Sequence, residues 1–293
     1  MALFESYERR IDKINGVLAQ YGIGSVEECR ELCKAKGFDP YEIVKGIQPI
    51  CFENACWAYT VGAAIALKSG VKTAADAARK IGETYGVRTL GLELEQKDYA
   101  SVEKMAADAF QWQGHIDVLV NNAGGGSGNG ECNFLKRDPA AIKNMIDVNL
   151  TGALYCCRAV CGYMAEAHHG CIINMASIAA LVGRDRAMYH DSNKMEQPVE
   201  YAAAKGGIIG MTQDLAAYMA PYGVRVNCIS PGGFDKGDLP EAFTKAYGAA
   251  TPLGRMGKMG EEIKGAALFL ASEASHYVTG HNLAVDGGFH VCK

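Results

Sequence analysis

Tyr201 and Lys205 are the two residues whose types and spacing point most directly to chemistry. They lie four positions apart in Tyr-Ala-Ala-Ala-Lys, so on a helix both side chains share one face. A tyrosine has an ordinary pKa of about 10, and a neighbouring ammonium lowers that value by favouring the phenolate. The pair is therefore a candidate proton donor and acceptor. A packed ring beside a solvated lysine is the alternative.

Three apolar segments are typical of buried strands, and each runs into small or polar residues. The segments and the residues that follow them are 115–120 with Asn-Asn-Ala-Gly at 121–124, 171–176 with Ser177, and 224–230 with Pro231-Gly232. Open α/β sheets bind ligands at the carboxyl ends of their strands, where small residues let a flat ligand approach the backbone. Ser177 places a hydroxyl at one such end, where it could hold a substrate oxygen.

In this order the motifs resemble the short-chain dehydrogenase/reductase family, over residues 79–289. The shared pieces are the turn at 121–124, Asn149 in Val-Asn-Leu-Thr-Gly, Ser177, Tyr201 with Lys205, Pro231-Gly232 and the ending at 278–288. The resemblance implies an α/β fold with a Rossmann-like, doubly wound parallel sheet. It also implies an NAD(P)-dependent oxidoreductase that interconverts an alcohol and a carbonyl.

The resemblance assigns catalytic roles to Asn149, Ser177, Tyr201 and Lys205. Tyr201 would exchange a proton with the substrate oxygen, and Ser177 would orient that oxygen. Lys205 would lower the pKa of the tyrosine and bind the nicotinamide ribose, while Asn149 would help to hold a water molecule in the proton relay. The residues expected to contact NAD or NADP are Glu95, Asn122, Ala123, Gly124, Tyr201, Lys205, Pro231, Gly232 and Phe234.

The first quarter of the chain departs from the family pattern. Family members begin with a strand, a Thr-Gly-x-x-x-Gly-x-Gly turn and a helix that receives the cofactor pyrophosphate, and no such turn precedes Arg79. Residues 1–78 instead show apolar side chains at helical spacing, as in Leu3, Tyr7 and Ile11. They resemble the amino-terminal segment of the GGGtGRT protein family, especially at 41–49, although the Gly-Gly-Gly-Thr-Gly-Arg-Thr motif is absent.

We therefore expect a helical segment at residues 1–78, followed by a Rossmann-like domain at residues 79–293 that lacks the usual first βαβ unit. That unit would carry the phosphate turn and the residue that selects NAD or NADP. Two functions stay open as a result. One is an NAD(P)-dependent enzyme, and the other is a catalytically silent binding or assembly protein of the same fold.

The stretch between Ser177 and Tyr201 is longer than is usual in the family. Its donors and acceptors include Arg184, Asp185, Arg186, His190, Asp191, Asn193, Lys194 and Glu196. So many polar groups beside a reacting centre favour a small polar substrate, such as a sugar or polyol, because an apolar ligand would leave them unpaired. A solvated loop is the alternative. Residues 234–250 form a second such segment, and we expect Phe234 to pack against the nicotinamide.

Composition is that of an ordinary soluble enzyme. The chain has 293 residues, of which 49% are hydrophobic and 21% charged, and its net charge of -4 offers no basic surface for nucleic acid. Neither a secretory signal nor a membrane span is evident, which predicts a cytoplasmic protein. The 11 cysteines lack C-x-x-C spacing, so we expect buried reduced thiols and no metal site.

The last part of the chain suggests how copies associate. A helix is expected to start within residues 257–263, with Glu261 and Glu262 favourably placed in its first turn, and a strand is expected around 283–285. Family members commonly form dimers and tetramers through these two elements. The resemblance therefore implies a homo-oligomer that acts on a small-molecule substrate.

Overall fold

The computed structural model describes residues 74–125, 131–192, 196–235, 237 and 239–292. At its centre lies a four-stranded sheet in the order β1-β2-β3-β6, in which every neighbouring pair is parallel. The strands are β1 (Val118–Asn121), β2 (Gly170–Met175), β3 (Val224–Pro231) and β6 (Asn282–Val285). The expected α/β class with a parallel, Rossmann-like sheet is confirmed.

The pairing of the strands brings their carboxyl ends to one edge of the sheet. Asn121 pairs with Asn174, and Met175 pairs with Ile229. The turns that follow β1, β2 and β3 therefore lie side by side at this edge. This is the place where parallel α/β sheets bind their ligands.

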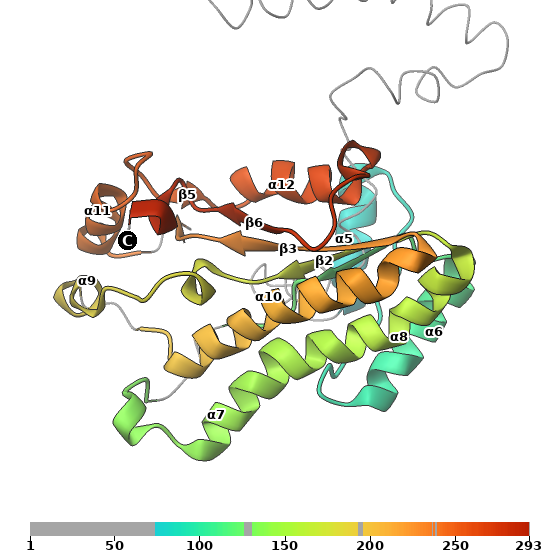
Figure 1. Cartoon of the computed structure of the whole chain (residues 1–293), viewed down its shortest axis with the longest axis horizontal. Helices are drawn as coiled ribbons and strands as arrows, with labels where there is room; N and C mark the ends of the chain where they lie inside the picture. Colours follow the sequence, from blue (N-terminus) through green and yellow to red (C-terminus); the bar gives the residue numbers. More distant parts are fainter. Residues whose placement is uncertain (1–73, 126–130, 193–195, 236, 238, 293) are drawn as a thin grey trace, which may run out of the picture. The chain divides into compact units, whose positions relative to one another are not determined.

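Helices cover both faces of the sheet (Figure 1). Helices α6 (Tyr99–Gln113), α8 (Gly152–Ala167) and α10 (Val199–Met219) lie on one face, and α12 (Glu262–Ala271) lies on the other. Successive residues of β2 point to opposite faces, so Ile172 packs with the first group and Ile173 with α12. Burial on both faces explains why Cys171, Ile172 and Ile173 follow one another in β2 without an alternating polar residue.

Helix α10 positions the candidate tyrosine and lysine. Its buried residues recur at three- and four-residue spacing, which gathers them on one face of the helix. They are Glu200, Tyr201, Ala204, Lys205, Ile208, Thr212, Ala216 and Met219. The helix starts after Pro198, and the face that packs against the sheet is thus the face that carries Tyr201 and Lys205.

The other elements surround this frame. The remaining α-helices are α5 (Ala74–Tyr85), α7 (Pro139–Ile146), α9 (Arg186–Asp191) and α11 (Glu241–Ala249). A π-helical turn, η2 (Asp147–Thr151), joins α7 to α8. Short 3-10 helices are η1 (Phe134–Lys136), η3 (Ile178–Ala180), η4 (Ala220–Tyr222), η5 (Glu273–Ser275) and η6 (Phe289–Cys292). Among these residues no helix has both the length and the apolarity needed to cross a membrane.

The expected helix start within residues 257–263 lies later than Gly257 in the structure. Gly257 and Lys258 form strand β5 (Gly257–Lys258), which pairs in parallel with β4 (Phe234–Asp235), and α12 begins at Glu262. The backbone N–H of Lys258 donates to the Glu262 carboxylate, and Gly260 has a φ of +80°. A φ in this range interrupts a right-handed helix, so residues 257–261 cannot belong to it.

The amino-terminal expectations fall mainly outside the described residues. Helix α5 begins at Ala74 and runs across the expected domain boundary between residues 78 and 79. The other expected helices, and the likeness to the GGGtGRT family, concern residues 1–73. The boundary therefore stays a prediction. Within the described part of the chain, no strand precedes β1.

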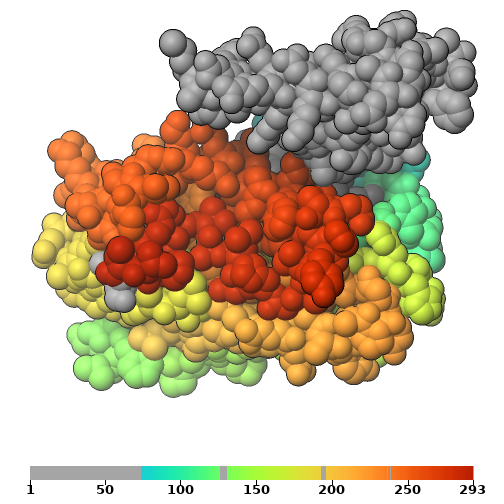
Figure 2. Space-filling view, turned by 45° about the horizontal axis from the view of Figure 1, so that its top comes forward, coloured from blue at the N-terminus to red at the C-terminus, as the bar shows by residue number. Residues whose placement is uncertain are grey.

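A small apolar cluster joins segments that are far apart in the sequence. Met188 of α9, Phe243 and Tyr247 of α11, and Phe289 of η6 belong to it, and the rings of Tyr247 and Phe289 stack with centroids 4.5 Å apart. Figure 2 shows the dark red carboxyl-terminal residues beside the orange α11 and the yellow segment of α9. The polar segment that precedes Tyr201 is thus packed against the end of the chain.

The described cysteines of α8 are buried or partly buried thiols. Burial raises the pKa of Cys156 and Cys161 to about 11, and it raises that of Cys157 further. A thiol with a raised pKa is rarely ionised at neutral pH and is a poor nucleophile. Packing is therefore the role that the structure gives to these three side chains.

Candidate active site

Tyr201 and Lys205 lie together, as the spacing predicts. Tyr201 is 8% exposed and Lys205 is 5% exposed, and the Lys205 Nζ atom lies 5.7 Å from the centre of the tyrosine ring. Lys205 Nζ donates a hydrogen bond of 2.7 Å to the carbonyl oxygen of Met175, at the end of β2. An ammonium has three donors, so it can bind further acceptors while this bond holds it in place.

The pKa of the Tyr201 phenol lies above its ordinary value, whereas the sequence predicted a lowered one. Burial raises this pKa, and a hydrogen bond with Ser177 and the charge of Arg184 only partly oppose the rise. Burial also lowers the pKa of Lys205, to about 8. Burial therefore disfavours the charged form of both groups, and the residues that act against it at the tyrosine are Ser177 and Arg184.

Ser177 lies directly after β2 and next to the tyrosine. Its hydroxyl accepts a hydrogen bond of 3.2 Å from the Ala179 backbone N–H, which begins the short helix η3. The same side chain is hydrogen-bonded to Tyr201. Two hydroxyl groups thus meet at the carboxyl end of β2, where both can reach one oxygen atom of a substrate.

Asn149 is buried in the π-helical turn η2, with 2% of the residue exposed. Its Oδ1 accepts from the Gly125 backbone N–H at 3.0 Å, and its Nδ2 donates to the carbonyl oxygens of Gly125 and Met145, each at 3.1 Å. The amide therefore holds the turn that follows β1. Turns of this π type are frequent at functional sites. The expected role of Asn149 in a proton relay stays a prediction.

The turn after β1 leaves backbone open at the sheet edge. Asn122 and Ala123 are partly exposed, and Gly124 is exposed with a φ of +138°. A Cβ atom on Gly124 would lie 2.7 Å from Asn149 Oδ1, so only glycine is compatible with this turn. An uncovered turn at a strand end, beside a lysine with donors to spare, suits the flat rings and hydroxyl groups of a dinucleotide.

Pro231, Gly232 and Phe234 follow β3 at the same edge. The Gly232 backbone N–H donates to the carbonyl oxygen of Val285 at 2.9 Å, which ties this turn to β6. A Cβ atom added to Gly257 would lie 3.0 Å from the Phe234 ring, so the ring packs against that glycine. The expected contact of Phe234 with nicotinamide stays a prediction.

Glu95 and Gln96 differ in their exposure and in the groups to which they bond. Glu95 is exposed, and its carboxylate accepts a hydrogen bond of 3.1 Å from the Lys97 backbone N–H. Gln96 is partly buried, and its Nε2 donates to the carbonyl oxygen of Val148 at 2.7 Å. Gln96 therefore anchors this segment to η2, and Glu95 stays at the surface. Its expected contact with the cofactor is a prediction.

The structure adds a residue that sequence reasoning did not single out. The Arg184 guanidinium carbon lies 5.7 Å from the centre of the Tyr201 ring. Nη1 donates to the carbonyl oxygen of Gln197 at 2.8 Å, and Nη2 donates to the Gln197 side-chain oxygen at 3.0 Å. In the sequence Arg184 is one of several polar residues in a segment without periodicity, so no spacing signal could have placed it beside the tyrosine.

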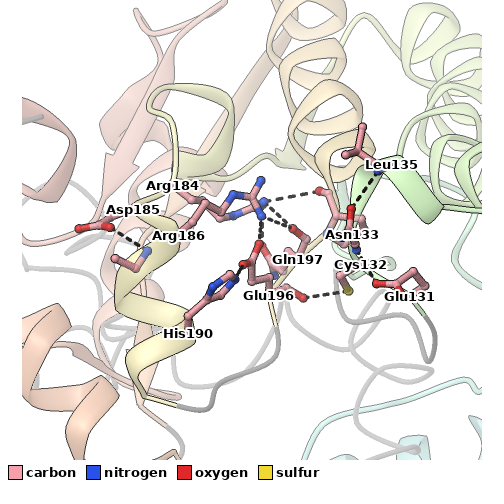
Figure 3. A network of polar contacts seen from close by, with 12 residues as sticks. Glu131, Cys132, Asn133, Leu135, Arg184, Asp185, Arg186, His190, Glu196 and Gln197 are labelled. Atoms are coloured by element: carbon pink, nitrogen blue, oxygen red, sulfur yellow. Dashed lines mark hydrogen bonds and ion pairs between the residues drawn. The ribbon is translucent and has the colours of Figure 1, made fainter.

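A polar network occupies the same segment (Figure 3). The carboxylate of Glu196 lies between Arg186 and His190 and bonds to both side chains. Burial works against ionisation of Glu196, but the hydrogen bonds from Arg186 and His190 outweigh it and hold its pKa below the ordinary value. The Cys132 thiol also donates to the Glu196 carbonyl oxygen at 3.3 Å.

A buried ion pair lies beside the tyrosine on α10. Arg137 Nε donates to Glu200 Oε1 at 2.7 Å, and both side chains are buried. The other carboxylate oxygen of Glu200 is buried and has no hydrogen-bond partner within the described part of the chain. Arg137 Nη1 also donates to the carbonyl oxygen of Glu131 at 2.7 Å. The pair therefore ties the segment before α7 to the first turn of α10.

Comparisons with known proteins agree with this architecture. Residues 47–290 match the family described as Enoyl-(Acyl carrier protein) reductase. The chain is 32% identical over 239 residues to the NADP-dependent mannitol dehydrogenase of Alternaria alternata, covering 80% of this chain and 85% of that protein.

Solved structures show the same relationship. A gluconate 5-dehydrogenase from Burkholderia cenocepacia, in complex with NADP and tartrate, has a TM-score of 0.65 and 31% identity, covering 74% of this chain and 81% of that one. A short chain dehydrogenase from Leptospira borgpetersenii with bound NAD+ has a TM-score of 0.62 and 34% identity, covering 68% of this chain and 74% of that one.

The parallel sheet, together with Ser177, Tyr201 and Lys205 at the carboxyl ends of its strands, defines an α/β oxidoreductase of the dinucleotide-binding type. The chain belongs to the short-chain dehydrogenase/reductase family, as its motifs predict. It is accordingly an enzyme of the NAD(P)-dependent class, and its cofactor is NAD or NADP. The alternative of a catalytically silent protein is not favoured.

Proposed function

We propose that this enzyme interconverts an alcohol and a carbonyl on a small polar substrate, such as a sugar or polyol. The observation that carries the proposal is the meeting of the Ser177 and Tyr201 hydroxyls beside the Lys205 ammonium. The names of two relatives, a mannitol dehydrogenase and a gluconate 5-dehydrogenase, support a polyhydroxy substrate. The polar segment before Tyr201 supports it too, because its donors suit hydroxyl groups.

In this proposal Tyr201 is the acid and base of the reaction. Its phenol donates a proton to the carbonyl oxygen during reduction and takes it back during oxidation, and Ser177 holds that oxygen by a hydrogen bond. Bound NAD or NADP supplies or accepts the hydride. A phenol with a raised pKa keeps its proton at neutral pH, which suits the donor role.

Lys205 and Asn149 position the other parts of the site. Lys205 is anchored at the Met175 carbonyl oxygen, and we assign its remaining donors to the ribose hydroxyls of the cofactor. Asn149 holds the turn at Gly125, so that Asn122, Ala123 and Gly124 stay open to the cofactor. Glu95, Pro231, Gly232 and Phe234 complete the proposed cofactor contacts.

Nicotinamide fluorescence tests this function. We expect saturable binding of NADH or NADPH to the full chain, and turnover of at least one compound from a panel of polyols and ketoses. Tyr201→Phe should lower kcat by about 10²–10⁴-fold and leave cofactor binding nearly unchanged, because only the acid-base group is removed. Tyr218→Phe, at an exposed position of the same helix, is the matched control. A Tyr201→Phe enzyme with full activity would falsify the mechanism, and no binding at millimolar cofactor would contradict the function.

We also propose that the protein is a cytoplasmic homo-oligomer, a dimer or tetramer, associated through α12 and β6. Phe269 on α12 and Tyr277 after it are exposed large apolar side chains, which support an interaction surface there. Sedimentation measures the assembly state, and Phe269→Glu should shift it toward monomer. A wild-type monomer at micromolar concentration would contradict this part of the proposal.

A further inference from the structure

Two arginines of the segment before Tyr201 lie two positions apart and differ in their hydrogen-bond partners. Arg186 has a carboxylate partner, Glu196, and its side chain is 41% exposed. Its charge is thus neutralised by a neighbour and screened by solvent. Figure 3 shows this pairing together with His190 on the other side of Glu196.

Among the described residues no carboxylate is hydrogen-bonded to Arg184, and Glu196 acts on it only through its charge, as the smallest of the effects on the pKa of Arg184. Its hydrogen-bond acceptors are the backbone oxygens of Gln197 and, at 3.5 Å, Pro198, together with the Gln197 side-chain oxygen. Burial lowers its pKa, and the nearby charge of Arg186 adds to this effect. A partly buried cation whose hydrogen-bond partners are all neutral would be stabilised by an anion bonded directly to it.

The guanidinium of Arg184 also has unused hydrogen-bonding capacity. An arginine carries five N–H donors in a planar fork, and the three acceptors of Arg184 leave at least two of them. Such a fork matches the two oxygens of a carboxylate better than a lysine does.

The position of Arg184 connects these donors to the reaction. Its guanidinium carbon lies 5.7 Å from the centre of the Tyr201 ring, so its charge acts on the phenol that exchanges a proton with the substrate. A group bound to Arg184 therefore belongs to the same small molecule that reacts at Tyr201.

We infer that Arg184 binds a carboxylate of the substrate, and that the substrate is a polyhydroxy acid or its keto acid rather than a neutral polyol. This inference rests on the proposed function of the same site. The reaction is unchanged: in reduction the carbonyl carbon gains hydride from NAD(P)H and its oxygen takes the proton of the Tyr201 phenol. Oxidation is the reverse, in which the Tyr201 phenolate accepts the hydroxyl proton as the alcohol carbon loses hydride to NAD(P)+. The carboxylate takes no part in the bond changes.

The test compares each acid with the neutral alcohol of the same carbon skeleton, using the full chain with NAD+ or NADP+. Suitable pairs are D-gluconate with D-glucitol and D-mannonate with D-mannitol. We expect the wild-type enzyme to prefer the acid of at least one pair by kcat/KM. Arg184→Met should lower that preference about 10- to 100-fold, mainly by raising KM, because it removes a charge-assisted hydrogen bond to the carboxylate.

Two further variants separate recognition from a structural role. Arg186→Met removes the neighbouring guanidinium, which already has a carboxylate partner, and should leave the preference for the acid unchanged. Arg184→Lys keeps the charge and should retain part of the preference. Equal losses for acid and neutral alcohol in Arg184→Met would assign Arg184 to loop structure and overturn the inference.

If none of these compounds is turned over, a direct measurement of their binding still tests the inference. Calorimetry measures D-gluconate and D-mannonate binding to the wild-type enzyme saturated with NADH or NADPH, and to Arg184→Met. Absent or Arg184-independent binding would overturn the inference. Saturable cofactor binding and a Tyr201-dependent turnover of any neutral alcohol would then leave the proposed function standing, so the two failures are distinguishable.

Discussion

The catalytic group and the segment at residues 184–197 meet at Tyr201, but they are held in different ways. Lys205 and Ser177 bond to backbone atoms at the end of β2, and Asn149 bonds to the backbone after β1. In the segment, Arg186, His190 and Glu196 are held mainly by one another. The proposed catalytic residues are thus held by the backbone at the strand ends, whereas the network of Arg186, His190 and Glu196 depends on side chains that can change without disturbing them.

The largest expected effect comes from the backbone-held group. Lys205→Met should lower kcat by about 10²–10⁴-fold and, unlike Tyr201→Phe, should also weaken NADH or NADPH binding. The reason is that the variant removes both the anchor at Met175 and the donors assigned to the cofactor. Fluorescence titration and steady-state kinetics measure the two losses.

Lys104→Met, at an exposed position of α6, is the control for this variant. Cofactor binding of wild-type strength in Lys205→Met would show that the ammonium contributes nothing to holding the dinucleotide.

The first turn of α10, which follows the segment at residues 184–197 and carries Tyr201, should depend for its stability on the buried ion pair between Arg137 and Glu200. Glu200→Ala leaves the Arg137 guanidinium buried without its carboxylate, which should lower the free energy of unfolding by about 3–5 kcal/mol. Urea denaturation measures this loss. Glu241→Ala removes the partner of Lys245 in an exposed ion pair and should cost no more than about 1 kcal/mol. Similar costs for the two variants would contradict the difference in burial.

The pH dependence of kcat/KM should reflect the ionisation of Lys205. Burial lowers its pKa to about 8, so the ammonium is present below that pH and is lost as the pH rises through it. In the reduction direction, kcat/KM should therefore be level below about pH 8 and fall about tenfold per pH unit above it. Tyr201 keeps its proton over this range because its pKa is raised.

The lowered pKa of Lys205 should also make the free energy of unfolding depend on pH. The unfolded chain holds a proton on this lysine up to about pH 10.4, so it binds more protons than the folded state between about pH 8 and that value. Stability from this residue should thus rise with pH in that window and be absent from Lys205→Met. An activity profile that stays level to about pH 10 would contradict the lowered pKa.

The smallest effect is expected from the side-chain-held segment. Glu196→Gln should lower the free energy of unfolding by only about 0.2–1 kcal/mol, because its partner Arg186 is 41% exposed. The pKa of Glu196 is lowered, so its contribution is present above the ordinary value of about 4.3 and is lost as the pH falls through the lowered pKa. Urea denaturation at neutral and acidic pH should show the difference only at neutral pH. A loss as large as that of Glu200→Ala would mean that this network is structural.

The fold and the proximity of Ser177, Tyr201 and Lys205 could be predicted because they depend on local patterns. An apolar run that ends in Ser177, and a helix with Tyr201 and Lys205 one turn apart, place these residues at one sheet edge. The proximity of Arg184 could not be predicted, because its position depends on packing of α9 against α11. The direction of the tyrosine pKa was missed for a related reason, since the depth of burial is set by the whole fold and not by the neighbouring lysine.

The start of α12 shows the limit of pattern reasoning at a boundary. Glu261 and Glu262 are typical of a first helical turn, and Glu262 does lie there. The same carboxylate, however, also bonds back to the Lys258 backbone, in a strand that pairs with Phe234. Sequence spacing cannot separate these two uses of one side chain, because the second depends on a partner more than twenty positions away.

The π-helical turn at residues 147–151 has a consequence for any insertion or deletion nearby. It lies within a continuous run of helix from Pro139 to Ala167, and a π turn accommodates one more residue than an α turn does. An extra residue in a regular α-helix would rotate everything after it by about 100°, and the wider π turn absorbs that rotation locally. Removing a single residue here should close the π turn into an α turn and keep the buried face of α8, including Val160 and Met164, toward the core, whereas the same deletion inside α8 would rotate that face away.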